Sequence, residues 1–310
     1  FRDARLTVFR FKTARSAEEQ FAAMTFILPD GSSYVAFRGT DSTIVGWKED
    51  FNMTFLNPVP AQEEARAYLE YVASVTAGPL YVGGHSKGGN LAVYAVATCN
   101  KSCRERVVRV FSHDGPGFHR EFCASDAYRN ILPIMVKTVP KSSMIGAVLS
   151  EGPDCHPIIV ESGGFSLFQH NPFLWEVDVE SATFVEADGF TASSRYFDST
   201  LDAWMDKYSL AERARFVDAL FDVIRVTGAK RFSDIMADRK TNVLLMLEAV
   251  EGLDPDLQQF IRDVLRSFAR TATVEKAAGA ASGIAGTIKK ARPSVALAVT
   301  TFKNRGEGSD

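Results

Sequence analysis

The sequence has no uninterrupted run of about 18 apolar residues, the length that a helix needs to cross a bilayer. No transmembrane segment is therefore expected. The chain also has little excess of either charge, because 35 basic and 38 acidic residues leave a formal net charge of -3. This balance gives no indication of a basic face for a nucleic acid. Methionine is absent from position 1, so we expect that a leader or an upstream segment preceded Phe1.

Cysteine is rare, with four residues in a chain of 310: Cys99, Cys103, Cys123 and Cys155. The first two form a C-x-x-x-C pair, but no companion cluster of His and Cys at zinc spacing follows it. We interpret all four as reduced thiols rather than metal ligands or disulfides, which favours a cytoplasmic protein. The sequence predicts neither a metal nor another cofactor.

The remaining composition is that of a globular protein, with 46% hydrophobic and 24% charged residues. Strand-like and helix-like segments alternate in the first part of the chain, which favours an α/β fold with a mostly parallel sheet. From Ser199 onward, apolar residues recur at steps of three and four, as in helices. Residues 209–212, Ser-Leu-Ala-Glu, match a capping box at one helix start.

The stretch from Pro79 to Ala97 carries the clearest chemical signal. A short apolar run, Leu80 to Val82, predicts a buried strand, and a helical pattern begins at Asn90. Between them, residues 84–88 read Gly-His-Ser-Lys-Gly, which matches the G-x-S-x-G nucleophile elbow. This context places Ser86 at a helix N-terminus, where a developing oxyanion is stabilised. We predict a catalytic serine, with a structural turn and a helix-capping serine as the alternative.

A second glycine-containing loop follows an early strand. Segments 22–28 and 33–38 predict a hairpin, and the second of them runs into Arg38-Gly-Thr-Asp-Ser. Such a loop is a natural place for an oxyanion-hole donor. The alternative is a simple turn with Arg38 in a structural ion pair.

Phe-Arg-Gly-Thr followed by Trp47 and Asp50, with Gly-His-Ser-x-Gly-Gly about forty residues later, resembles the class 3 (fungal-type) lipase family. It is closer to a group of bacterial lipase-like proteins that carry Lys after the serine. The resemblance covers roughly residues 22–177 and implies an α/β-hydrolase fold. It also implies an oxyanion contact from the backbone N–H of Thr40, with its hydroxyl as a further candidate, and a second from the N–H of Lys87. The lipases usually have Leu at the position of Lys87. The lysine side chain would either favour substrates with a negative group or point into solvent.

The catalytic acid departs from this resemblance. A class 3 lipase places its aspartate after the strand predicted here at 131–139, and this chain has Ser142 and Ser143 instead. Asp114 follows the preceding predicted strand, at the carboxyl edge where open α/β sheets place their active sites. We favour Asp114, although an aspartate that merely stabilises the following Gly-Pro-Gly turn is nearly as good an interpretation. Asp154 and Glu151 are alternative candidates for the acid. It is also possible on the sequence that the site has no carboxylate and that a neutral group such as Ser143 orients the histidine.

The base is assigned to His170, one of five histidines. Hydrolases of this type take their histidine from a loop after the last strands, in the chain order Ser, acid, His. His170 occupies such a loop and precedes an aromatic segment, as in the family that the chain resembles. The alternative is a histidine that caps the loop.

These assignments predict an α/β-hydrolase core over residues 1–180 and a helical cap or C-terminal helical extension over 181–310. Four apolar residues of this extension could line an acyl-binding wall, although core packing is the preferred interpretation: Phe216, Leu220, Phe221 and Met246. The tail from Ala277 to Lys290 fits a solvated helix better than one that touches a membrane.

The predicted function is a serine hydrolase that cleaves carboxylic esters through an acyl-enzyme on Ser86. Its partner would be a small-molecule or lipid ester, with peripheral membrane contact left open and no nucleic acid. The alternatives are a weak or inactive binding protein with the hydrolase fold, and an amidase or peptidase. The sequence predicts no particular oligomeric state.

Overall fold

The structure is a computed structural model of the chain. It describes residues 2–14, 18–41, 43–146, 148–149, 152–163 and 169–262, without the side chains of residues 232, 236 and 239.

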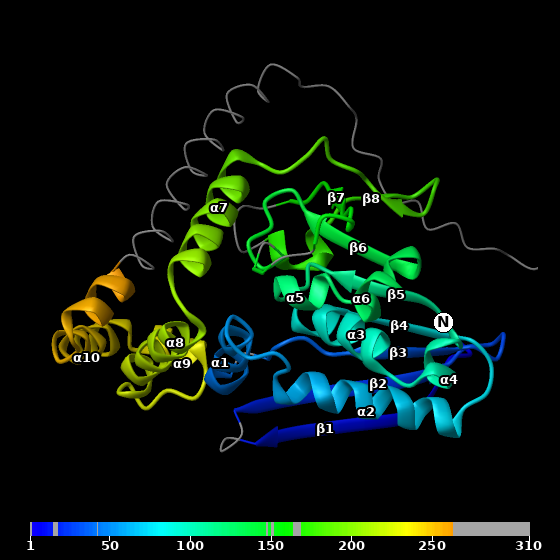
Figure 1. The fold of residues 1–310 in the computed structure, drawn as a ribbon, viewed down its shortest axis with the longest axis horizontal. Helices are drawn as coiled ribbons and strands as arrows, with labels where there is room; N and C mark the ends of the chain where they lie inside the picture. Colours follow the sequence, from blue (N-terminus) through cyan, green and yellow to red (C-terminus); the bar gives the residue numbers. More distant parts are fainter. Residues whose placement is uncertain are drawn as a thin grey trace, which may run out of the picture.

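A seven-stranded sheet forms the centre of the molecule (Figure 1). Its strands lie side by side in the order of the sequence, and the last five are parallel to one another. The first two strands extend the sheet in antiparallel fashion at one edge. The strands are β1 (Arg5–Ala14), β2 (Glu19–Ile27), β3 (Ser33–Phe37), β4 (Leu80–His85), β5 (Val107–His113), β6 (Met135–Pro140) and β7 (Ile158–Val160).

The helices of this part of the chain are α1 (Ile44–Asn52), α2 (Pro60–Val75), α3 (Lys87–Thr98), α4 (Lys101–Arg104), α5 (Arg120–Cys123) and α6 (Asp126–Arg129). Because successive parallel strands are neighbours in the sheet, right-handed crossovers bring their connections to one face. The two long helices, α2 and α3, pack against each other on that face (Figure 1). Every residue from Lys87 to Ala97 in α3 is buried, which explains why its sequence is small and apolar nearly all round.

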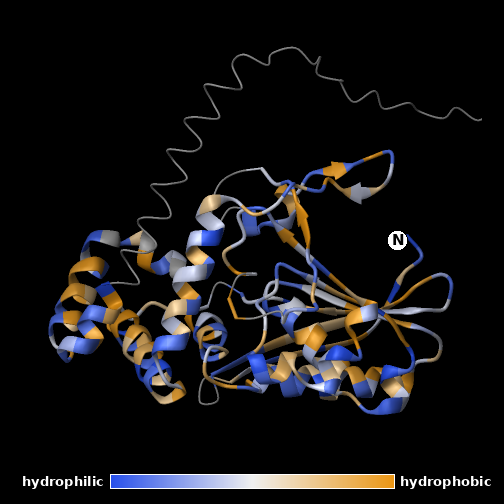
Figure 2. Cartoon of the chain, turned by 45° about the horizontal axis from the view of Figure 1, so that its top comes forward, coloured by the Kyte–Doolittle hydropathy of each residue, from blue (hydrophilic) through white to orange (hydrophobic). Residues whose placement is uncertain are grey.

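The helix that precedes the elbow, α2, is amphipathic. Its buried side turns toward the sheet and α3, and Tyr68 packs edge-on against Phe21 and Phe37 in the core. Figure 2 shows apolar residues along the strands, and mixed apolar and polar faces on the helices.

The C-terminal part is helical, as predicted. It contains a short hairpin of β8 (Val177–Asp178) and β9 (Thr183–Phe184), followed by α7 (Ala192–Lys207), α8 (Leu210–Arg225), α9 (Phe232–Ala237) and α10 (Arg239–Glu251). Residues 255–262 are also helical, and the tail from Ala277 to Lys290 lies outside the described residues. The capping box is present, because the Ser209 hydroxyl accepts from the Glu212 N–H and the Glu212 carboxylate accepts from the Ser209 N–H.

The predicted α/β-hydrolase class, with a mostly parallel sheet and a C-terminal helical region, is confirmed by this architecture. Phe216 is buried in an apolar cluster of the C-terminal helices, and Phe221 is buried in a second cluster that also contains residues of α1, so the role of both is packing. The division into a core over 1–180 and a helical part over 181–310 stays a prediction.

Two local expectations differ from the structure. The first twenty residues carry few sequence signals, yet residues 5–14 form β1, which is exposed along most of its length and is held by pairing with β2. The strand expected to begin at Ile131 begins at Met135, because Leu132–Ile134 form a 3₁₀ turn around Pro133, which has no N–H to donate.

Candidate active site

The turn between β4 and α3 has the geometry of a nucleophile elbow. Ser86 is the N-cap residue of α3, with a φ of 58° and a ψ of -135°. This region is rare for residues other than glycine and costs on the order of 1–3 kcal/mol. The turn is also tight, because a Cβ on Gly88 would lie 2.2 Å from the carbonyl oxygen of Phe37. A serine held in this conformation is typical of a functional turn.

The predicted oxyanion loop lies directly against the elbow. A Cβ on Gly39 would lie 2.7 Å from the carbonyl oxygen of His85 and 3.1 Å from the Cβ of Ser86. The next residue, Thr40, is therefore beside the serine. Lys87 opens α3, so its N–H is the first of the helix and has no carbonyl partner within it. The structure thus brings both predicted donor residues to Ser86.

Asp114 and Ser86 follow adjacent strands. His85 pairs with His113 in the register of β4 and β5, and the Ser86 N–H donates to the His113 carbonyl over 2.9 Å. Asp114 is fully buried, with a φ of 47°, and its N–H donates to the Thr138 carbonyl over 2.7 Å. The carboxylate is thereby fixed near the serine.

His170 meets this carboxylate. The distance between Nδ1 of His170 and Oδ2 of Asp114 is 2.7 Å, which is that of a charge-assisted hydrogen bond. The second carboxylate oxygen, Oδ1, accepts from the Ser143 hydroxyl at 2.5 Å and from the Gly146 N–H at 3.1 Å. Ser143 therefore contacts the aspartate, whereas the sequence left it open as a direct partner of the histidine.

The loop that carries His170 is held from several sides. Nε2 of His85 lies 2.7 Å from the His170 carbonyl oxygen, and the two imidazole rings lie 4.4 Å apart. Burial lowers the pKa of His85 to about 4, so this ring is neutral at pH 7 and donates its Nε2–H. The indole of Trp175 donates to the Gln169 carbonyl over 2.8 Å, and Oε1 of Gln169 accepts from the Ser142 N–H. None of these supports was predicted from the sequence, because each joins segments that are distant in the chain or carry no motif.

Thr40 is anchored by its side chain. Its hydroxyl lies 2.7 Å and 2.5 Å from the two carboxylate oxygens of Asp50 in α1. Burial raises the pKa of Asp50 to about 6, while the charge of Lys87 and the Thr40 hydrogen bond favour the carboxylate. Because the hydroxyl donates to Asp50, the backbone N–H is the group of Thr40 that is left for an oxyanion.

The expectation for the Lys87 side chain was wrong. It points neither to solvent nor toward a substrate: it is completely buried, and its Nζ lies 2.8 Å from Oε2 of Glu49. Nζ also donates to the carbonyl and side-chain oxygens of Gln20. No sequence signal pointed to Glu49 or Gln20, which approach Lys87 from α1 and β2.

The rival acid that the structure describes, Asp154, does not join this group. Asp154 is exposed and lies on the wall of a small cavity with Cys155 and His156. Glu151 lies outside the described residues. Of the two proposed carboxylates that the structure describes, Asp114 is the one that bonds to His170.

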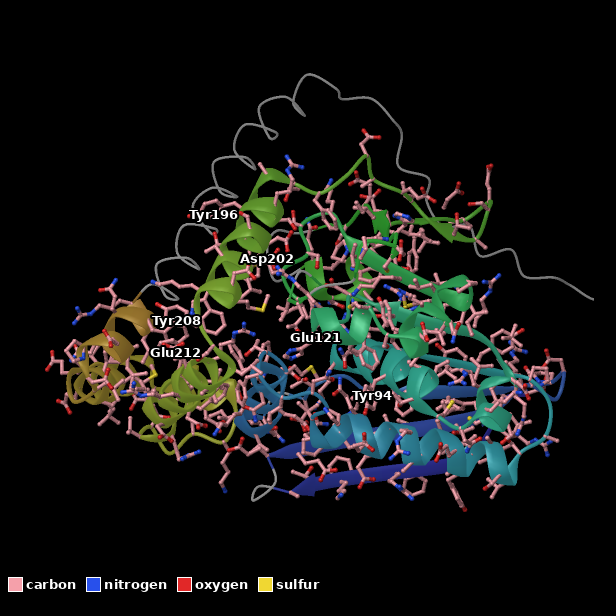
Figure 3. All side chains as sticks on the ribbon, viewed as in Figure 1. Tyr94, Glu121, Tyr196, Asp202, Tyr208 and Glu212 are labelled. Atoms are coloured by element: carbon pink, nitrogen blue, oxygen red, sulfur yellow. The ribbon has the colours of Figure 1, made fainter. Side chains whose placement is uncertain are left out.

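A cavity of about 270 Å³ lies behind this site, between β6 and α7. It reaches Gly146, which donates to Asp114, and Lys137 lies on its wall. Asp198 and Asp202 of α7 line it, and Asp202 is labelled in Figure 3. Burial, together with the charge of Asp202, raises the pKa of Asp198. Its lining does not include the serine, the histidine or Thr40, so we do not assign it as the substrate cleft.

Within the part of the chain that the structure describes, no cluster of His, Cys, Asp and Glu could hold a metal ion. The same residues include no helix with the length and apolar character that a membrane span requires.

Comparisons with known proteins give a family and a set of similar folds. The model of the Mbeg1-like family matches residues 1–222. No curated protein matches the chain. Among solved structures, a Rhizomucor miehei lipase propeptide complex is similar, with 15% identity, a TM-score of 0.37 and coverage of 51% of this chain and 57% of the lipase. A structure of M37 lipase is similar over 47% of this chain and 57% of that one, with 14% identity and a TM-score of 0.37. A fungal lipase–inhibitor complex has 14% identity and a TM-score of 0.38, and the alignment covers 52% of this chain and 66% of the lipase.

Proposed function

The chain belongs to the Mbeg1-like family, and we propose that it is a serine hydrolase that cleaves carboxylic esters through Ser86. The observation that carries the proposal is the 2.7 Å bond between Asp114 and His170, beside a serine in a strained elbow. A buried aspartate on Nδ1 selects the histidine tautomer whose Nε2 can accept a proton. This is the arrangement that an activated serine requires.

In the proposed reaction, Nε2 of His170 accepts the proton of Ser86 as Oγ attacks the acyl carbon. The N–H groups of Thr40 and Lys87 hold the oxyanion, and the carboxylate of Asp114 stabilises the imidazolium. His170 then protonates the departing alkoxide, which leaves an acyl-enzyme. Water, deprotonated by the same histidine, hydrolyses the acyl-enzyme and restores the serine.

The test uses a fluorophosphonate probe and p-nitrophenyl esters of short and long acyl chains. We expect the folded protein to be labelled on Ser86, and Ser86→Ala to lower ester turnover by about 10⁴-fold or more. Ser102→Ala is the matched control. This serine is exposed on α4, and within the part of the chain that the structure describes its hydroxyl donates to the side-chain oxygen of Asn100. An unlabelled serine together with unchanged turnover in Ser86→Ala would favour a non-catalytic binding protein.

Matched p-nitroanilides separate the proposed esterase from an amidase or peptidase on the same scaffold. We expect the ester of each pair to be cleaved faster. Faster turnover of the anilides would move the proposal to amide substrates while leaving the roles of Ser86 and His170 in place.

A further inference from the structure

The side chain of Lys87 makes a complete set of contacts away from solvent. Its three ammonium donors are matched by three oxygens within 2.9 Å: the Gln20 carbonyl at 2.7 Å, the Gln20 amide at 2.9 Å and Glu49 at 2.8 Å. The side chains of Lys87 and Glu49 are both 0% exposed. Burying two charges costs several kcal/mol each, and well-packed apolar residues commonly do as well for stability. Stability alone is therefore a weak explanation for this pair.

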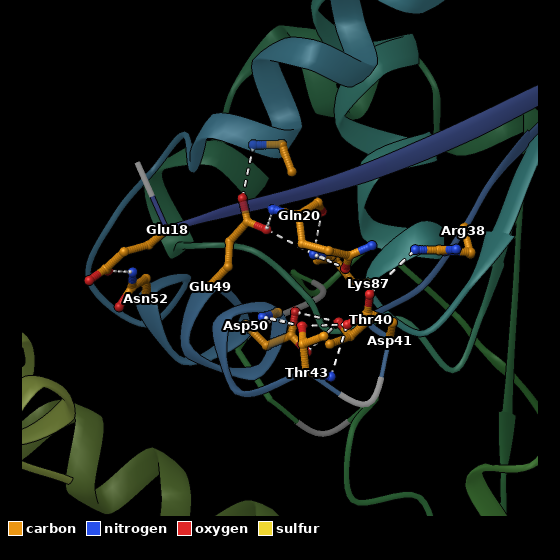
Figure 4. A network of polar contacts seen from close by, with 12 residues as sticks. Glu18, Gln20, Arg38, Thr40, Asp41, Thr43, Glu49, Asp50, Asn52 and Lys87 are labelled. Carbon is orange, nitrogen blue, oxygen red and sulfur yellow. Dashed lines mark hydrogen bonds and ion pairs between the residues drawn. The ribbon is translucent and has the colours of Figure 1, made fainter. Parts of the chain in front are cut away.

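Helix α1 connects the pair to the oxyanion loop. Glu49 binds Lys87, and the adjacent residue, Asp50, binds the hydroxyl of Thr40 (Figure 4). One turn of α1 thus holds residue 40 and residue 87, the two residues whose N–H groups face the proposed oxyanion. These two residues lie on different elements, so their relative position depends on such a connection.

The connection is itself anchored. Oε2 of Glu49 accepts from the Gln20 N–H at 3.0 Å, and Oε1 accepts from the Ala61 N–H at 3.1 Å. Glu49 therefore joins α1 to β2, to the first turn of α2 and to the start of α3 (Figure 4). All of its partners are buried, which leaves the carboxylate little freedom to move.

We propose that the Lys87 side chain is a positioning residue: through Glu49 and α1 it fixes Thr40 relative to Ser86, so that both oxyanion donors stay in place. This inference rests on the proposed hydrolase function. Lys87 would then contribute its backbone N–H to the reaction and its ammonium to the geometry of the site.

The charges around Asp50 make the proposal testable without relying on activity alone. The groups that act on this carboxyl are the Lys87 ammonium, the Glu49 carboxylate, the Thr40 hydroxyl and His170. The ammonium favours the ionised form and the Glu49 charge disfavours it. Removing the Lys87 ammonium must therefore raise the pKa of Asp50, and removing the Glu49 charge must lower it.

The experiment compares Lys87→Met, Glu49→Gln and the double variant with the wild-type chain. Lys87→Met leaves a buried carboxylate unpaired, so the double variant, which removes both charges, keeps the test valid if the single one does not fold. Lys48→Met is the matched control, because Lys48 is a largely buried lysine on α1 that pairs with Glu18 and Asp218 instead.

We expect Lys87→Met and the double variant to lower kcat for esters about tenfold or more with little change in KM, and Lys48→Met to leave kcat near the wild-type value. Carbon-13 NMR of the Asp50 carboxyl should show its titration midpoint move up by about one pH unit in Lys87→Met and down in Glu49→Gln. The opposite shifts report the electrostatic link from the Lys87–Glu49 pair to Asp50, and the fall in kcat at an unchanged KM reports the positioning role.

The proposal is overturned if the Asp50 midpoint is the same in Lys87→Met as in the wild type, or if Lys48→Met lowers kcat as much as the double variant does. Failure of the hydrolase proposal is distinguishable, because it appears as a wild-type chain that the probe does not label. The NMR titration still tests the link between Lys87 and Asp50 in that case.

Discussion

Replacing Asp114 by asparagine should leave the site folded and remove most of its activity. Oδ1 of Asp114 already accepts from the Ser143 hydroxyl and the Gly146 N–H. An asparagine would keep its carbonyl oxygen on these two donors, so its NH₂ group would face Nδ1 of His170. The imidazole would then carry its proton on Nε2, where it cannot accept the proton of Ser86.

The size of the loss follows from two contributions. The charge-assisted bond from His170 to a fully buried carboxylate is worth about 2–3 kcal/mol. Reversing the tautomer costs about one more ordinary hydrogen bond, or roughly 1–2 kcal/mol. A total of about 4 kcal/mol in the barrier corresponds to a loss of about 10³-fold in kcat/KM.

The assay is p-nitrophenyl ester hydrolysis at pH 8, with the rate of fluorophosphonate labelling as a second measurement. Asp154→Asn is the control, because Asp154 is an exposed aspartate that was a rival candidate from the sequence. We expect it to remain within about twofold of the wild type, since exposed side chains outside the site contribute little. Near-wild-type rates in Asp114→Asn, with an unchanged thermal unfolding midpoint, would refute the assignment of the acid.

Two further predictions concern groups around the site. The pKa of Asp50 is raised to about 6 in the fold, above its unfolded value, so its contribution to stability is present below about pH 4 and is lost as pH rises toward 6. Urea unfolding should therefore show Asp50→Asn gaining about 2 kcal/mol relative to the wild type between pH 4 and pH 7, whereas a constant difference would contradict the shift. His85→Phe removes the bond to the His170 carbonyl but keeps a ring of similar size, so we expect kcat to fall about tenfold with KM unchanged. Unchanged kcat in this variant would mean that the His170 loop is held without His85.

The elbow shows how far local sequence reaches. The pattern of a strand, a glycine turn and a helix lies within about twenty residues. A Cβ on Gly84 would lie 2.4 Å from the backbone of Gly88, so the turn itself requires glycine. The same holds for α2, whose apolar spacing gives its buried face, and for the capping box at Ser209. In these elements the deciding interactions lie between residues a few positions apart.

The choice of the acid shows where local sequence stops. Asp114, Asp154 and Glu151 were all candidates for the acid from the sequence. The residues next to each of them do not show which one reaches the histidine. The register between β4 and β5, which pairs His85 with His113, is what brings Asp114 to the serine. Register is a property of the assembled sheet, because it depends on all the strands that pack together.

The sequence by itself determined the strand–turn–helix around Ser86, the fold class and the position of His170 in a loop after the last parallel strand, because each depends on periodicity, glycine positions or chain order. Tertiary structure alone decided that His170 meets Asp114, that Thr40 bonds to Asp50, and that Lys87 turns inward. A lysine after the serine is equally compatible with solvent, with a substrate or with a buried partner. Glu49, 38 positions away along the chain, supplies that partner only once α1 has packed against the start of α3.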